Sequence, residues 1–261
     1  MKPWILHSAF LFGMLATVGA LAGDDPSALA QRARLFWEAR VSGDWATEYG
    51  FTPAEDRGKA TVEQFVAHRR DVGPFRYFSA RVGEAATADA IGWVDVQYDV
   101  KVAKYLDLPA RHVQIWDLWR KRDGEWYPMP KAQRKEFPRV PPQHRSAQEE
   151  AVLGQRVDGL WKARVAGQWA RTYAYLDPEF RASTPEKVFK RQKPRYLYLS
   201  HRLEWVEAVG DEGRAKVAVR RKPNDPSLTK ADPQEVTMLE DWVKIKGQWY
   251  RSVPKAEGTG E

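Results

Sequence analysis

Apolar positions in the first third of the chain change from helical to strand spacing. Between residues 26 and 42 apolar side chains recur three and four positions apart, which predicts an amphipathic helix. In residues 91–102 they alternate instead, with valines on one face and polar or aromatic residues on the other. This order of patterns predicts helices first and an antiparallel sheet afterwards.

The remaining elements of this half are bounded by turn and cap residues. Thr61 and Gln64 have the spacing of a capping box, so a helix should begin there and end at Gly73. The expected helices are 26–42, a short one carrying Trp45 and Tyr49, and one from Thr61; the expected strands are 75–82, 91–102, 111–121 and 126–127.

The same pattern occurs a second time along the chain. Residues 35–45, LFWEARVSGDW, recur as residues 159–169, GLWKARVAGQW, and the closing pair Trp126-Tyr127 recurs as Trp249-Tyr250. The period is the size of a domain, so it indicates two copies of one domain and not a solenoid. The second copy should contain helices at 150–165, 168–175 and from Thr184, and strands at 196–208, 214–222, 235–246 and 249–250.

The N-terminus has the composition of a secretory signal peptide. A lysine is followed by a mostly apolar run and by small residues at Ala20 and Ala22, so cleavage is predicted after Ala22. The apolar run is close to spanning length, which leaves an uncleaved anchor as the alternative. No other stretch is apolar enough to span a membrane. A periplasmic or secreted protein is the expectation.

These features divide the chain into five segments. A Pro-rich basic stretch lies between the copies and is expected to be a solvated linker. The predicted segments are a signal peptide at 1–22, a first domain at 23–130, the linker at 131–147, a second domain at 148–255 and a disordered tail at 256–261.

Two such units resemble the nuclear transport factor 2-like superfamily. The resemblance rests on residues 35–45, on their second copy and on the closing Trp-Tyr pairs, and it covers both halves. It implies an α+β fold of two tandem cones, each with three helices followed by a curved four-stranded antiparallel sheet around a cavity. It also implies that the two copies could pack sheet against sheet as an intrachain pseudo-dimer. The superfamily includes isomerases, cyclases, dehydratases, small-molecule binders and association domains, so fold alone selects no function.

Composition excludes several kinds of chemistry. The chain has no cysteine, so disulfides, thiolate catalysis and a lipoprotein anchor are excluded. The five histidines are scattered without paired spacing, and no phosphate-binding loop or serine nucleophile motif is present. No metal or cofactor is therefore predicted. The net charge of +7 is spread among mixed acids and bases, which does not suggest nucleic-acid binding.

Comparison of the copies selects candidate pocket residues. Arg40 and Arg164 lie on the apolar stripe of the long helix in each copy, where an unpaired guanidinium would be costly. Asp117 and Glu240 lie at matching positions on the apolar face of the third strand. The pairs Arg40–Asp117 and Arg164–Glu240 are therefore predicted inside the cones. Such a pair could orient the helix on the sheet or anchor a ligand.

Two matching tyrosines complete the candidate set. Tyr49 and Tyr173 could reach the cavities, although core packing with one hydroxyl partner is the simpler interpretation. The repeated tryptophans could stack on sugars or fill the cores. The leading hypothesis is a non-catalytic binding or scaffolding protein, whose partner is a protein or a small hydrophobic ligand of the cell envelope. The alternative is a cavity enzyme with Asp117 or Glu240 as base and a tyrosine as polariser, and a weaker one is a polysaccharide-binding module.

Overall fold

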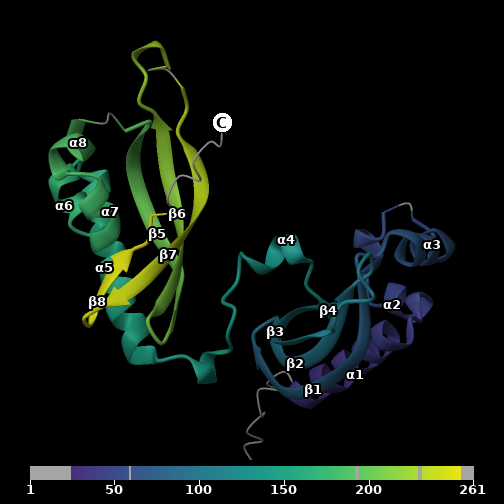
Figure 1. The fold of residues 1–261 in the computed structure, drawn as a ribbon. Helices are drawn as coiled ribbons and strands as arrows, with labels where there is room; N and C mark the ends of the chain where they lie inside the picture. The colour runs from purple at the N-terminus through teal and green to yellow at the C-terminus, as the bar shows by residue number, and fades with distance from the viewer. Residues whose placement is uncertain (1–24, 59, 192–193, 229–230, 254–261) are drawn as a thin grey trace, which may run out of the picture.

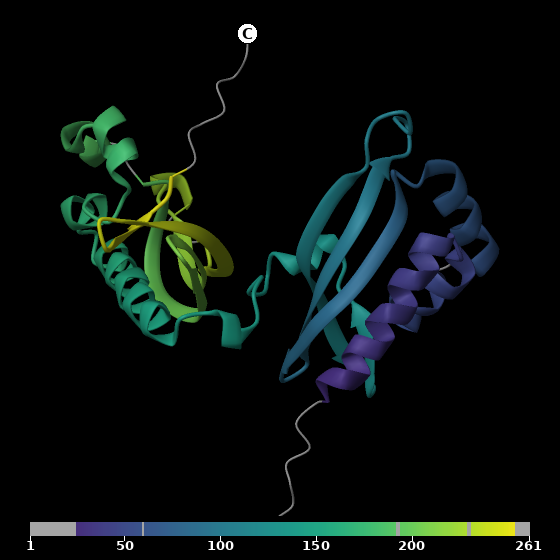
Figure 2. The same cartoon turned by 60° about the horizontal axis from the view of Figure 1, so that its bottom comes forward.

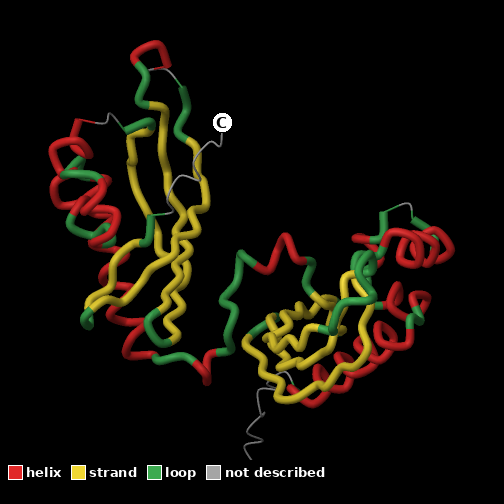
Figure 3. Tube along the Cα trace, viewed as in Figure 1, coloured by secondary structure: helices red, strands yellow, loops and turns green. Residues whose placement is uncertain are grey.

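The computed structural model describes residues 25–58, 60–191, 194–228 and 231–253. The predicted signal peptide at 1–22 and the predicted tail at 256–261 lie outside these residues. The fold is α+β, as predicted: two domains follow one another, and each places helices before a curved four-stranded antiparallel sheet (Figures 1 and 3). No helix in the described ranges is both long and apolar enough to cross a membrane.

The first domain closely follows the predicted element order. Its sheet has the strand order β1-β2-β3-β4, and the long helix α1 lies along one face of the sheet (Figure 2). The elements are α1 Pro26–Ser42, α2 Trp45–Gly50, η1 Ala54–Asp56, α3 Val62–Val72, β1 Phe75–Ala88, β2 Ile91–Val102, β3 Arg111–Arg122 and β4 Glu125–Pro128.

The second domain repeats this arrangement with one additional helix. Its sheet has the order β5-β6-β7-β8, again antiparallel throughout. The elements are α5 Ala147–Val165, α6 Trp169–Tyr173, α7 Pro178–Ser183, α8 Glu186–Arg191, β5 Tyr196–Val209, β6 Glu212–Pro223, η3 Pro226–Leu228, β7 Gln234–Ile245 and β8 Gln248–Arg251.

Local chemistry explains where the elements begin and where they differ from expectation. The capping box of Thr61 and Gln64 is formed at the start of α3. Strand β1 is longer than predicted because a register shift between Val82 and Ala85 lets it continue. Helix α7 was not among the helices expected for the second copy. Asp177 caps the helix by accepting a hydrogen bond from the amide of Phe180.

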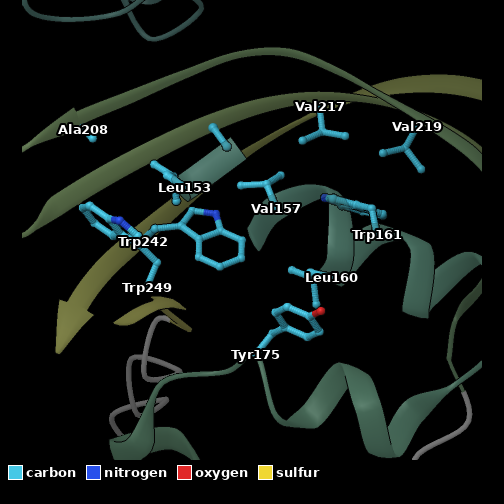
Figure 4. Close-up of a cluster of buried hydrophobic side chains, with 11 residues drawn as sticks. Leu153, Val157, Leu160, Trp161, Tyr175, Ala208, Val217, Val219, Trp242 and Trp249 are labelled. Atoms are coloured by element: carbon cyan, nitrogen blue, oxygen red, sulfur yellow. The ribbon is translucent and has the colours of Figure 1, made fainter. Parts of the chain in front are cut away.

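Each domain has its own apolar core between the long helix and the sheet. In the second domain Leu153, Val157 and Trp161 of α5 lie beneath Val217 of β6, with Trp249 closing the far end (Figure 4). The long helix packs closely against a glycine of the sheet in both domains. A Cβ atom on Gly92 would lie 2.4 Å from Cδ2 of Leu29, and one on Gly213 would lie 2.9 Å from Cδ2 of Leu153. These glycines permit the close helix–sheet packing.

The segment between the domains is structured and holds both sheets. It contains α4 Lys131–Arg134 and η2 Pro142–His144, and it lies between the two domains (Figures 1 and 2). The indole N–H of Trp93 in β2 donates to the carbonyl of Pro138 at 3.0 Å. The indole N–H of Trp205 in β5 donates to the carbonyl of Glu136, also at 3.0 Å. The expectation of a solvated linker was therefore wrong.

The same segment replaces the expected direct packing of the two sheets. Arg214 of β6 donates to the carbonyls of Lys135 and Phe137, and the amide of Val140 donates to Glu207 of β5. Within the described ranges the sheets are joined through this segment and not face to face. The predicted direct packing of sheet on sheet is therefore not formed within the described ranges; residues 131–146, here called the strap, join the two sheets instead.

Candidate ligand-binding cavity in the first domain

The first domain contains a cavity of about 850 Å³ between its long helix, its short helices and its sheet. The start of the interdomain segment forms one wall. About a third of the lining residues are aromatic. The lining residues include Phe36, Trp37, Arg40, Glu48, Asp56, Arg69, Phe75, Tyr77, Tyr98, Ile115, Asp117, Lys131 and Arg134.

Stacked aromatic rings form the apolar wall. Trp37 of α1 lies over Tyr98 of β2 with ring centroids 4.8 Å apart, and Tyr77 of β1 meets Trp37 edge-on at 5.5 Å. The guanidinium of Arg40 lies 4.3 Å from the centroid of the Phe36 ring. Such contacts orient a cation without neutralising it. The wall therefore combines flat apolar surfaces with positive charge.

The predicted pair of Arg40 with Asp117 was wrong. Arg40 Nε donates instead to Glu48 Oε1 at 2.9 Å, and Arg69 of α3 binds the same carboxylate at 2.7 Å. Glu48 is only 5% exposed, so two guanidinium groups neutralise one buried acid. The comparison of copies missed this acid because the matching residue of the second domain is Thr172. The signal that the sequence offered for Glu48 was an acid placed between Trp45 and Tyr49 on a short helix.

Asp117 takes its partner from the interdomain segment. Its carboxylate lies 2.7 Å from Nη2 of Arg134 in α4, and its side chain is 1% exposed. The indole N–H groups of Trp37 and Trp119 both donate to Oδ2 at 3.2 Å. Two hydrogen bonds to Oδ2 and one ion pair at Oδ1 therefore hold this buried acid, which is how a charged carboxylate is tolerated inside a protein.

In the second domain the predicted pair of Arg164 with Glu240 is confirmed. The two side chains meet at 3.1 Å, and Arg251 of β8 binds the same carboxylate at 2.8 Å. Trp161 also donates to Glu240 at 3.2 Å. The Glu240 side chain is fully buried. Burial lowers the pKa of Arg164, and the carboxylate of Glu240 opposes this effect.

The candidate tyrosines are used to fix the short helices. The Tyr49 hydroxyl donates to the carbonyl of Ala60 at 2.7 Å, and Tyr49 does not line the cavity. The Tyr173 hydroxyl donates to the carbonyls of Arg181 and Thr184. Both hydroxyls therefore hold adjoining chain segments.

Two other tyrosines, Tyr77 and Tyr98, line the cavity, and Tyr98 is the one whose pKa is shifted. Burial raises its pKa above the ordinary 10.0, and the neighbouring Tyr77 and Asp117 raise it further. The phenol therefore remains neutral in ordinary conditions and offers one polar atom on an apolar wall.

Two other kinds of site have little support in the described residues. Every tryptophan in the described ranges is buried or half-buried, which leaves no exposed row of rings for sugar stacking. Those ranges contain no group of three or more acidic or histidine side chains that could hold a metal ion.

Comparisons with known proteins identify no family and no activity. No protein-family model matches the sequence, and no similar curated protein was found. Solved structures similar to the chain include NTF2-like proteins. One is an NTF2-like protein of unknown function from Pseudomonas putida, with 16% identity, TM-score 0.31, 45% of this chain and 94% of the other covered.

Two further solved structures are similar to parts of the chain. An Ntf2-like protein involved in plasmid conjugation shares 11% identity at TM-score 0.29, with 89% of this chain and 99% of the other covered. A SEC-C motif-containing protein from Rhodopseudomonas palustris shares 19% identity at TM-score 0.30, with 37% and 71% covered. At these values the function must be derived from this chain's own residues.

Proposed function

We propose that this protein is a non-catalytic binding protein of the cell envelope. The first domain holds a small, largely apolar ligand, and the second domain with the interdomain segment serves as a scaffold. The observation that carries this proposal is the cavity of about 850 Å³ beside Trp37, Tyr77 and Tyr98. Its size falls in the range of about 300–1,000 Å³ typical of ligand pockets, and its aromatic walls with a few charged groups are typical of them too.

The ion pairs and hydrogen bonds of the two buried acids in the cavity support binding over catalysis. A general base must reach its substrate with a free lone pair. Asp117 is held by Arg134 and two indoles, and Glu48 is held by two arginines. In this proposal both acids are structural: they fix the cations and rings that contact the ligand. A cavity enzyme would have to release one of these pairs in each turnover.

The packing of the second domain supports a scaffolding role for it. Its core residues Val157, Leu160 and Trp161 are fully buried, and its acid Glu240 is enclosed by two arginines (Figure 4). Trp205 and Arg214 of the second sheet donate hydrogen bonds to backbone carbonyls of the strap. This domain therefore positions the segment that forms one wall of the first cavity.

The binding function can be tested with N-phenyl-1-naphthylamine, a neutral dye that fluoresces in apolar pockets. Addition to the protein should increase dye fluorescence. The variant Ile115→Trp places a large ring in the cavity and should abolish the increase. The matched control is Gln114→Trp, which adds the same ring to the exposed face of the same strand. An absent increase, or equal loss in both variants, would overturn the proposal.

Export is a separate part of the proposal. It rests on the sequence of residues 1–22, which lie outside the described structure. The envelope and cytoplasmic fractions of a Gram-negative host expressing the full chain should be separated. The envelope form is expected to begin at Gly23 in N-terminal sequencing. An intact Met1 in the membrane fraction would indicate the anchor, and an intact chain in the cytoplasm would exclude export.

A further inference from the structure

Within the proposed binding function, we propose that the ligand is a single-chain amphiphile with an anionic head group. The inference rests on that function and adds the chemical class of the ligand. Two observations carry it: an excess of cations over acids among the residues that line the cavity, and an adjoining pocket whose lining is mostly apolar.

The cations outnumber the acids among the residues that line the cavity. Glu48 is shared by Arg40 and Arg69, Asp117 is bound by Arg134, and Asp56 is bound by Arg122 at 2.9 Å. Lys131 lines the cavity and has no ion pair within the described ranges. Among the residues that line the cavity, the four cations Arg40, Arg69, Lys131 and Arg134 face three carboxylates, and Arg122, which lies outside the lining, is also bound by Glu55. An anionic head group would therefore find partners there, whereas a cationic one would find every carboxylate occupied.

A second pocket adjoins the cavity, and its lining is mostly apolar, with Lys101 and Arg111 as its charged members. This pocket has a volume of about 250 Å³ and shares Phe75 and Tyr98 with the main cavity. Val100, Val102 and Leu108 contribute to its walls. The two spaces therefore adjoin, and a chain that starts among the arginines can extend past Tyr98 toward the loop between β2 and β3.

The rim of this second pocket exposes large apolar side chains. Phe75 is 45% exposed, Tyr105 is 56% exposed and Leu108 is 54% exposed. Clustered apolar surface of this kind is unfavourable in water and marks a binding site for apolar groups. An alkyl chain lying on it would remove this surface from water. A short aromatic acid would reach the cations and leave the rim uncovered.

The test is displacement of N-phenyl-1-naphthylamine from the full chain by three compounds. They are dodecanoate, dodecyltrimethylammonium and benzoate, each below its micelle concentration. Dodecanoate should displace the dye at about tenfold lower concentration than either other compound, because it alone matches both ends. The titration is repeated with lysophosphatidylglycerol, which carries a phosphate head group in place of a carboxylate. Displacement by this compound as well would show that a lipid head group is accepted, and displacement by dodecanoate alone would indicate a free fatty acid.

Two variants probe the two ends separately. Lys131→Gln should weaken displacement by dodecanoate about threefold, the effect of losing one partly solvated ion pair. Leu108→Ser should weaken it about fivefold through lost apolar contact. Lys187→Gln on α8 and Leu228→Ser in the corresponding loop of the second domain are the matched controls, and both should leave displacement unchanged.

The outcomes separate this inference from the binding function itself. Failure of the dye to bind would overturn the binding function, and the ligand class with it. Normal dye binding with equal displacement by all three compounds would overturn the ligand class alone. The same conclusion would follow if neither Lys131→Gln nor Leu108→Ser changed displacement by dodecanoate.

Discussion

Arg134, which lies outside the repeated unit, binds Asp117 inside the first domain at a distance of 2.7 Å. In the second domain the matching acid, Glu240, is bound by arginines of the repeat itself, Arg164 and Arg251. The two domains therefore keep a buried acid at the same strand position and satisfy it from different parts of the chain.

Removal of Arg134 should destabilise the first domain. Breaking a buried ion pair by deleting one partner costs about 3–5 kcal/mol, and the partial exposure of Arg134 reduces the expected loss to about 2–3 kcal/mol. Urea unfolding of Arg134→Ala, followed by tryptophan fluorescence, measures the change. Lys131→Ala on the same helix should change stability little. Adding Asp117→Asn should recover part of the loss; if it adds further loss, the pair is not the cause.

Neutralising Glu240 should destabilise the second domain more strongly. The substitution Glu240→Gln leaves Arg164 and Arg251 without a counter-charge in a buried site, at a cost of about 3–5 kcal/mol. Calorimetry should show a lower unfolding temperature for the second domain and an unchanged one for the first. The control is Glu235→Gln, an exposed acid on the same strand. Equal effects of the two substitutions would show that burial of Glu240 is energetically unimportant.

Loss of the indole donors should release the strap from the sheets. Trp93→Phe and Trp205→Phe each remove a hydrogen bond to a strap carbonyl and keep an aromatic ring. The strap is rich in basic residues, so limited trypsin digestion should cut it faster in the double variant. Trp169→Phe, on helix α6, is the control. Unchanged cleavage in the double variant would show that these bonds do not hold the strap.

Ionisation of Tyr98 should occur above the ordinary range of a phenol. Burial, Tyr77 and Asp117 raise its folded pKa above 10.0, so the folded state retains this proton to higher pH than the unfolded state. Its contribution to stability is complete below pH 10 and declines as the pH rises from there toward the folded pKa. The difference between the absorbance titrations of wild type and Tyr98→Phe isolates this group. A midpoint at the ordinary value in that difference would contradict the burial argument.

Much of the architecture was predictable because the pattern is repeated. Spacing located the long helices, the capping box at Thr61 and the strand order, and comparison of copies found the pair of Arg164 and Glu240. The site in the first domain was less predictable. Glu48 has no acidic counterpart in the second copy, and Arg134 lies in a segment that composition describes as solvent-exposed. Comparison of repeats detects what the copies share and misses what distinguishes one from the other.

The position of Arg134 also bears on how the chain can be dissected. The repeated sequence of the first unit ends near Pro130, yet the counter-charge of its buried carboxylate comes four residues later. A fragment cut at the repeat boundary would carry an uncompensated negative charge beneath its tryptophans. An excised first domain should therefore extend through Arg134 at least, whereas the second domain carries both arginines of its buried acid between α5 and β8. The two copies of the repeat therefore differ in how much flanking chain each needs.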